Sequence, residues 1–175
     1  MLQHPGFDGL VLEADFGDRV MHSPLLTVKS DVGADETWSA GRYVEFVRDG
    51  DLLGKVKRKS DGSEIRGNIK SIKNGTWLFP KWNHGCYDAA QLIDGKKIRI
   101  VQVTKGKTHT MLVYFVSSLI QTLVTLGFEI ETIDFVVLGP EGCERPKLDT
   151  PVGDLSAWNW NVDMMRFLWL PRNAE

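Results

Sequence analysis

Residues 98–138 carry a strand pattern, a long apolar helix pattern and a second strand pattern, and this order constrains the fold more than any other feature of the chain. The second strand pattern, 133–138 (IDFVVL), is a near-continuous apolar run. Such a run is typical of a parallel strand that is covered on both faces. Two parallel strands joined by a helix form a right-handed crossover. The sequence therefore predicts an α/β or α+β domain.

The helix between these two strands is predicted to begin at Thr108 or Thr110, either of which can act as an N-cap, and to reach about Leu126. Its apolar face is expected to contain Leu112, Phe115, Val116, Leu119, Ile120, Leu123, Val124 and Leu126. Gly127 occupies the position at which a left-handed glycine often ends a helix. Polar residues interrupt the apolar run, so we expect a core helix and no membrane span.

Two more strands are predicted before residue 98. Residues 76–79 are apolar and β-prone, and Pro80 closes this segment. Residues 87–93 form the next strand, and Asp94-Gly95 then gives a strong signal for a tight hairpin. We therefore expect the strand 87–93 to pair with the strand that begins near residue 98.

The first part of the chain gives weaker signals. Residues 1–34 hold short apolar pieces between Gly, Asp and Pro, and are expected to form an arm of short strands or irregular structure. A helix is predicted over about 35–48, with Asp35 as its N-cap and Trp38 and Phe46 on its apolar side.

The length of 175 residues suits a single domain with one core. We expect that core at about 35–140, followed by a Trp-rich extension over 141–175. Within the extension, residues 155–170 are predicted to form a helix or an extended strap packed over the sheet. A protein-binding surface is the functional alternative for this segment.

Charge argues against a strongly basic nucleic-acid binder, because the net charge is −2 and the pI is near 6.1. One local segment, 54–74, is nevertheless basic and contains Lys55, Lys57, Arg58, Lys59, Arg66, Lys70 and Lys73. It is interpreted either as a solvated loop or exposed hairpin, or as a flap that contacts phosphates. Aromatic residues do not interleave with these charges, so a base-stacking surface is not indicated there.

The two cysteines, Cys86 and Cys143, have no zinc-type spacing and are expected to be free thiols. The N-terminus lacks the pattern of a signal peptide, so the cytosol or nucleus is the expected location. Motifs of serine hydrolases, zinc proteases and dinucleotide-binding folds are absent from the sequence.

A small polar constellation lies on the predicted strands. Asp88 stands on a mostly apolar strand, where a carboxylate is costly unless it is paired or bound. Gln102 and Thr104 share a face of the following strand. Lys105 is the basic residue at the end of that strand, and only a bulge would turn it to the same face. Strand-end, sheet-amide and ordinary β-strand roles for the first three residues stay open.

The order helix, three strands, helix, strand resembles the PD-(D/E)XK restriction-endonuclease-like core. That family places Asp on the second core strand, where Asp88 stands here, and (D/E)-x-K on the third, where Gln102-Val103-Thr104 stands. The segments YDA, VQVT and FVVL-P within 85–140 also resemble the nuclease-like domains of Crinkler effectors and retrotransposon hot spot proteins.

The resemblance implies a metal-dependent nuclease that acts on DNA or RNA, with Mg²⁺ held by Asp88 and Gln102 and with Thr104 and Lys105 at the catalytic site. Glu36 or Glu45, on the helix expected over 35–48, can add a third oxygen. Phosphate contacts are expected from Lys55, Lys57, Arg58 and Lys59. Gln102 stands in place of the family's acid and Thr104 in place of its lysine, so the resemblance also allows a degenerate site that retains nucleic-acid binding.

A second hypothesis is a non-enzymatic interaction module with the same fold and an inactive site. Its partner would be another protein, bound through the Trp-rich C-terminal region or an exposed sheet edge.

Overall fold

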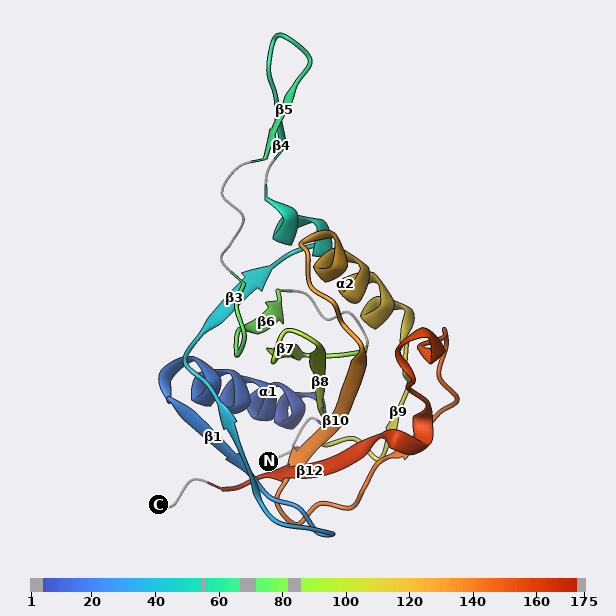
Figure 1. Cartoon of the computed structure of the whole chain (residues 1–175). Coiled ribbons are helices and arrows are strands. Elements are labelled where there is room, and N and C mark those ends of the chain that lie inside the picture. Colours follow the sequence, from blue (N-terminus) through green and yellow to red (C-terminus); the bar gives the residue numbers. More distant parts are fainter. Residues whose placement is uncertain (1–4, 55, 67–71, 82–85, 173–175) are drawn as a thin grey trace.

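The computed structural model describes residues 5–54, 56–66, 72–81 and 86–172. Its centre is a mixed six-stranded sheet with the order β12-β10-β8-β7-β6-β3 (Figure 1). The strands are β3 (Tyr43–Phe46), β6 (Trp77–Pro80), β7 (Ala89–Ile93), β8 (Lys97–Val103), β10 (Thr132–Pro140) and β12 (Arg166–Leu170). The chain therefore belongs to the α/β class in its broad α+β sense, as expected.

The predicted crossover is confirmed, because β8 and β10 pair in parallel and the helix α2 (Tyr114–Thr125) connects them. The buried residues Val116, Leu119, Ile120 and Leu123 follow the i, i+3, i+4, i+7 spacing of one helix face. The helix begins later than expected. Instead of capping a helix, Thr108–His109 form the short strand β9, which pairs with β11 (Lys147–Leu148).

Helix α2 ends at the predicted glycine. Gly127 has a φ of 96°, which favours glycine over every other residue. The N–H of Phe128 donates to the carbonyl of Leu123, and the N–H of Gly127 donates to the carbonyl of Val124. These two bonds form a Schellman motif, which satisfies carbonyls that the end of the helix leaves unpaired.

Strands β6, β7 and β8 form a meander, since β7 pairs antiparallel with both β6 and β8. Asp94 and Gly95 both have positive φ, 51° and 70°, as the turn between β7 and β8 requires. The expected hairpin is therefore confirmed.

The N-terminal expectation is wrong for residues 5–22, which form the helix α1 (Pro5–His22). Phe16 and Val20 lie one turn apart and are buried against the sheet. The i, i+4 ion pair between Asp15 and Arg19, with 2.7 Å between a carboxylate oxygen and a guanidinium nitrogen, supports the helix. Two glycines and a narrow apolar stripe hid this pattern in the sequence.

The helix expected over 35–48 is also wrong, because this region forms β2 (Glu36–Ser39), then β3, with the 3₁₀ helix η1 (Asp49–Leu53) after them. Trp38 is buried while its two neighbours face outward, which is the period of a strand. Gly41 adopts a φ of 84°, which breaks any helix between the two strands. Strand β2 pairs antiparallel with β1 (Leu25–Val28).

The sheet is covered on both faces, and successive residues of β8 enter opposite layers of core. Ile98 and Ile100 pack in the layer that contains α2. Val101 and Val103 pack in the layer that contains α1, β1 and β2. This alternation explains why the strand sequence is apolar almost throughout.

A row of polar side chains crosses the sheet under the β1–β2 hairpin. Arg99 donates to Asp134 at 3.0 Å and to Gln91 at 2.9 Å. Arg166 donates to both oxygens of Asp134 at 2.8 Å and also pairs with Glu36. Two arginines thus face two carboxylates, and the row fastens the hairpin to the sheet.

The Trp-rich extension contributes to the core. Its last segment is β12, which pairs in parallel with β10. Before it lie two 3₁₀ helices, η2 (Ser156–Trp158) and η3 (Val162–Met164). Trp160 is 5% exposed, and Trp158 packs against the same cluster. Trp158 and Trp160 therefore serve the core, and they offer little exposed area for the protein-binding surface considered as an alternative for residues 155–170.

Strands β4 (Val56–Arg58) and β5 (Glu64–Arg66) form the antiparallel hairpin expected as one alternative for the basic segment, and it projects from the body of the protein (Figure 1). Cys86 and Cys143 are free thiols. Within the described ranges, no helix is long and apolar enough to cross a membrane.

Candidate functional site

Asp88 stands immediately before β7 and is fixed against the end of β8. Its backbone N–H donates to the carbonyl of Val101 at 2.9 Å. One carboxylate oxygen, Oδ2, accepts from Nε2 of Gln102 and from the backbone N–H of Val103, both at 2.6 Å. The structure therefore brings together the first two residues of the constellation predicted from sequence.

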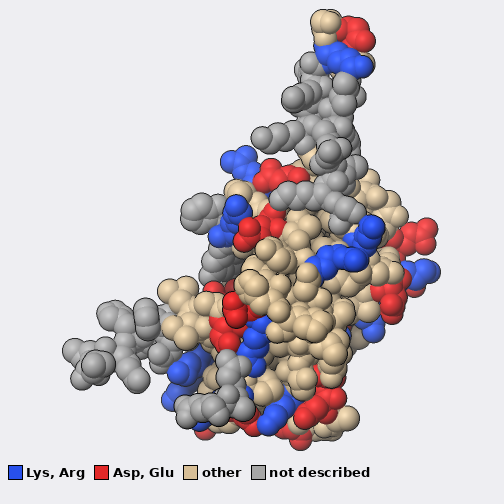
Figure 2. Space-filling view, turned by 90° about the vertical axis from the view of Figure 1, so that its left-hand side faces the viewer, with Lys and Arg blue, Asp and Glu red and all other residues tan. Residues whose placement is uncertain are grey.

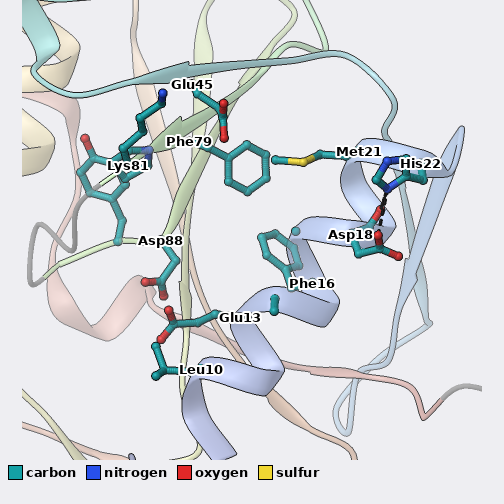
Figure 3. Close-up of a pocket in the computed structure, with 14 residues that line it drawn as sticks. Leu10, Glu13, Phe16, Asp18, Met21, His22, Glu45, Phe79, Lys81 and Asp88 are labelled. Carbon is teal, nitrogen blue, oxygen red and sulfur yellow. Dashed lines mark hydrogen bonds and ion pairs between the residues drawn. The ribbon is translucent and has the colours of Figure 1, made fainter. Parts of the chain in front are cut away.

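The second acid at this position is Glu13 of α1. Figure 3 shows the carboxylates of Glu13 and Asp88 pointing toward one another from the helix and the sheet. Burial is the main cause that raises the pKa of Asp88 to about 7, and the charge of Glu13 adds to it, while the hydrogen bonds from Val103 and Gln102 oppose it. Burial also raises the pKa of Glu13.

Both carboxylates face a cavity of about 800 Å³ between α1 and the β6–β7 end of the sheet. Its lining consists of Leu10, Glu13, Ala14, Phe16, Gly17, Asp18, Met21, His22, Glu45, Phe79, Pro80, Lys81, Tyr87 and Asp88. A cavity with converging polar groups and perturbed carboxyl pKa values is the best candidate for a functional site in this chain.

Gln102 is buried, and its amide is only half satisfied. Nε2 donates to Asp88, whereas the buried Oε1 has no hydrogen-bond partner among the described residues. Turning the amide over would direct this oxygen toward the Asp88 carboxylate. Two oxygens facing each other are stable only when a proton or a cation lies between them.

Thr104 and Lys105 follow Val103 at the end of β8, but they do not line the large cavity. Both line a separate cavity of about 20 Å³, together with Cys143 and Phe167. The Thr104 hydroxyl accepts from the backbone N–H of Gly106 at 3.0 Å, so it serves the turn after β8. The structure thus does not place these two residues with Asp88 in the large cavity.

The two glutamates considered as a third oxygen have different positions. Glu36 lies on β2 and pairs with Arg166 in the polar row. Glu45 lies on β3 and lines the large cavity. Lys81, which follows β6, is exposed at the same cavity and adds a positive charge there.

The basic residues expected to contact phosphate are only partly described. Lys55 lies outside the described residues, Lys57 and Arg58 lie on β4, and Lys59 is exposed at the hairpin turn. On the face shown in Figure 2, the described acidic and basic residues are interspersed and form no continuous basic surface there.

Sequence reasoning missed Glu13 and Lys81. Glu13 could have been found from the i, i+4 spacing of Leu12, Phe16 and Val20, which places Glu13 at the edge of a buried helix stripe. Lys81 follows the expected strand 76–79 and its closing proline, but no local pattern marks it as a site residue.

In the described part of the chain, no group of three His, Cys, Asp or Glu side chains is arranged to hold a metal ion. The oxygen donors that do converge are the carboxylates of Glu13 and Asp88. Carboxylate and amide oxygens are the ligand types that Mg²⁺ accepts, with water filling its remaining positions. These donors therefore suit Mg²⁺ chemically, as a partly hydrated ion.

Comparison with family models, with curated proteins and with solved structures returned no match for this chain.

Proposed function

We propose that this chain is a restriction-endonuclease-like domain that hydrolyses phosphodiester bonds in DNA or RNA at the cavity between α1 and the sheet, with help from Mg²⁺. The observation that carries this proposal is the meeting of Asp88 and Glu13 at that cavity. Two carboxylates that face each other, with the pKa of Asp88 raised to about 7, form an arrangement that a cation would stabilise.

The strand order supports the same class. Strands β6, β7 and β8 form a meander, α2 crosses over, and β10 returns parallel to β8. This is the order that the resemblance to the PD-(D/E)XK core implies, with α1 as the first helix in place of residues 35–48. Asp88 then stands at the start of the second core strand, and Gln102 stands on the third.

The roles of the residues follow from their positions. Asp88 and Glu13 would hold the ion, and Gln102 orients Asp88 through the 2.6 Å hydrogen bond. Bound Mg²⁺ would supply a water of lowered pKa and a charge that stabilises the phosphate. Lys81, exposed at the cavity, would pair with a phosphate oxygen and take the place that the resemblance assigned to a lysine on the third strand.

The test is a cleavage assay on single- and double-stranded DNA and RNA with Mg²⁺ or Mn²⁺. Asp88→Asn and Glu13→Gln should each lower the rate at least about a hundred-fold, because each removes an oxygen ligand and its charge. Glu129→Gln, an exposed acid beyond the cavity, is the matched control and should cleave like the parent protein.

Equal cleavage by the parent protein and both site variants would place any activity elsewhere. An absence of cleavage on all four substrates would leave the non-enzymatic module as the better account of the fold.

A further inference from the structure

The large cavity between α1 and the sheet carries an excess of acidic side chains. Among its described lining residues, Lys81 is the one lysine, and it faces four acids, which are Glu13, Asp18, Glu45 and Asp88. A cavity lined mostly by one sign of charge concentrates ions of the opposite sign. The lining therefore favours a cationic occupant.

The middle of this cavity is apolar. The half-buried side chains of Phe79 and Met21 both line it, and Figure 3 shows the thioether of Met21 directed toward the Phe79 ring. The same view shows this ring between Glu45 and the facing carboxylates of Glu13 and Asp88. A metal ion held by those two carboxylates would make no use of the apolar wall.

Neighbouring rings hold Phe79 in place. Its centroid lies 6.3 Å from that of Phe16 and 6.3 Å from that of Trp77, with which it is stacked. The exposed ring of Tyr43 meets it edge-on at 6.5 Å. A ring held on several sides is a pre-organised surface, because little side-chain entropy is lost when a ligand binds to it. Its face also attracts cations.

The order of acid, apolar wall and acid selects among cations. A compact inorganic ion can meet the carboxylates but gains nothing from Phe79 and Met21. An alkyl chain with an ammonium group at each end meets both, because its methylene groups cover the apolar wall while its charges reach the acids on either side. The cavity volume of about 800 Å³ is large enough for such a molecule.

We propose that this cavity binds an aliphatic polyamine, with one ammonium group at Glu13 and Asp88, its methylene chain across Phe79, and a second ammonium group at Glu45. Binding does not depend on the proposed function. A polyamine in this position takes the two carboxylates that the proposed function assigns to Mg²⁺, so the two cations compete and the polyamine inhibits cleavage.

The test is titration calorimetry of the full chain with spermidine, in a buffer without divalent ions. We expect one spermidine to bind per chain. Hexaamminecobalt(III) is the matched probe, because it carries the same charge without a methylene chain, and it should bind at least about five-fold more weakly. Added Mn²⁺ should weaken the apparent affinity for spermidine.

Phe79→Leu keeps an apolar side chain and removes the ring. It should lose at least about three-fold in affinity for spermidine and keep the parent affinity for Mn²⁺. Phe79→Tyr keeps a ring and should bind spermidine like the parent protein. Tyr114→Leu is the matched control, since it removes an exposed aromatic ring on α2 outside the cavity, and it should also bind like the parent.

Glu45→Gln tests the second ammonium position, because it removes one exposed charge on β3 at the cavity. It should lose at least about three-fold in affinity for spermidine. Glu129→Gln, an exposed acid outside the cavity, is its control and should bind like the parent protein.

Three results would overturn the inference. The first is equal affinity for spermidine and hexaamminecobalt(III), and the second is unchanged spermidine affinity in both Phe79→Leu and Glu45→Gln. The third is Phe79-dependent binding of an oligolysine peptide without binding of spermidine, which would assign the cavity to a lysine side chain of a protein partner.

The failure of this inference and that of the proposed function give different results. Binding of Mn²⁺ that depends on Asp88, without binding of spermidine, rejects only the polyamine site. Binding of spermidine that depends on Phe79, without cleavage of any nucleic acid, rejects only the proposed function.

Discussion

Glu13 on α1 and Asp88 at the start of β7 direct their carboxylates toward each other across one cavity, although they lie far apart in the sequence. The negative charge of these two carboxylates must be balanced, because like charges in a half-buried site disfavour ionisation. A cation is one answer, and a shared proton in the metal-free protein is the other.

The stability of the metal-free protein should fall as pH rises from about 4 to about 7. The pKa of Asp88 is raised from 3.8 to about 7 on folding, so the folded state holds a proton that the unfolded state has lost in this range. Glu13 acts in the same direction, since its pKa is also raised. Urea unfolding measured across this pH range checks the slope.

Asp88→Asn is the control for that slope, because asparagine keeps the shape and cannot ionise. It should flatten the decline and make the protein more stable than the parent above pH 7, by at most about 4 kcal/mol. A parent protein whose stability rises steadily from pH 4 to 7, with no difference from the variant, would contradict the assignment of this pKa.

The polar row under the β1–β2 hairpin should be strongly stabilising. Arg99 and Asp134 are 12% and 13% exposed, so Asp134→Asn leaves the buried Arg99 guanidinium without its paired carboxylate. We expect a loss of about 3 kcal/mol or more in the free energy of unfolding, measured by urea denaturation.

The pair formed by Arg145 and Asp31 offers a matched comparison, because its side chains are 45% and 42% exposed. Asp31→Asn should cost less than about 1 kcal/mol. Equal losses for the buried and the exposed substitution would show that the row does not fasten the hairpin.

Two glycine-to-alanine substitutions should change the stability of the fold in opposite directions. Gly127→Ala forces a left-handed conformation on an alanine at the end of α2 and should destabilise the fold by about 1 kcal/mol. Gly9 lies inside α1 and has open space around its Cα, so Gly9→Ala should stabilise the fold by about 0.5 to 1 kcal/mol. Thermal unfolding of both variants measures the difference, and melting temperatures that shift in the same direction would contradict the positions of these two glycines.

The charge at the cavity can be tested through Lys81. Lys81→Gln should reduce cleavage more than substrate binding, because its contact to phosphate gains strength as charge develops on the reacting group. Lys59→Gln, on the projecting hairpin, should instead weaken binding and leave the rate of the bound complex unchanged. Identical effects of both substitutions on rate and binding would argue against a special role for Lys81.

The centre of the fold followed from local patterns. The run 133–138 and the Asp94-Gly95 turn depend on residues that are neighbours in sequence, and both were confirmed. The face of α2 was confirmed at Val116, Leu119, Ile120 and Leu123, but Val124, expected on that face, is exposed. Regions with mixed signals were less predictable. The sequence of residues 36–46 resembles the start of a helix, but Gly41 and the buried Trp38 fit strands. The segment forms strands because β2 pairs with β1 and β3 pairs with β6.

Only part of the candidate site could be predicted from the sequence. Asp88 and Gln102 could be paired because a hairpin joins their strands. Glu13 could not, because its meeting with Asp88 depends on how α1 packs across the sheet. Thr104 and Lys105 follow Gln102 closely in the sequence, yet they line the separate small cavity, and the Thr104 hydroxyl is used by the N–H of Gly106.

Titration calorimetry with Mn²⁺ tests the central claim most directly, using the parent protein, Asp88→Asn, Glu13→Gln and the double variant. If the two carboxylates form one cation site, the parent binds a single ion, each single variant loses at least about ten-fold in affinity, and the double variant loses little more than either one. Unchanged Mn²⁺ affinity in both single variants would contradict the claim.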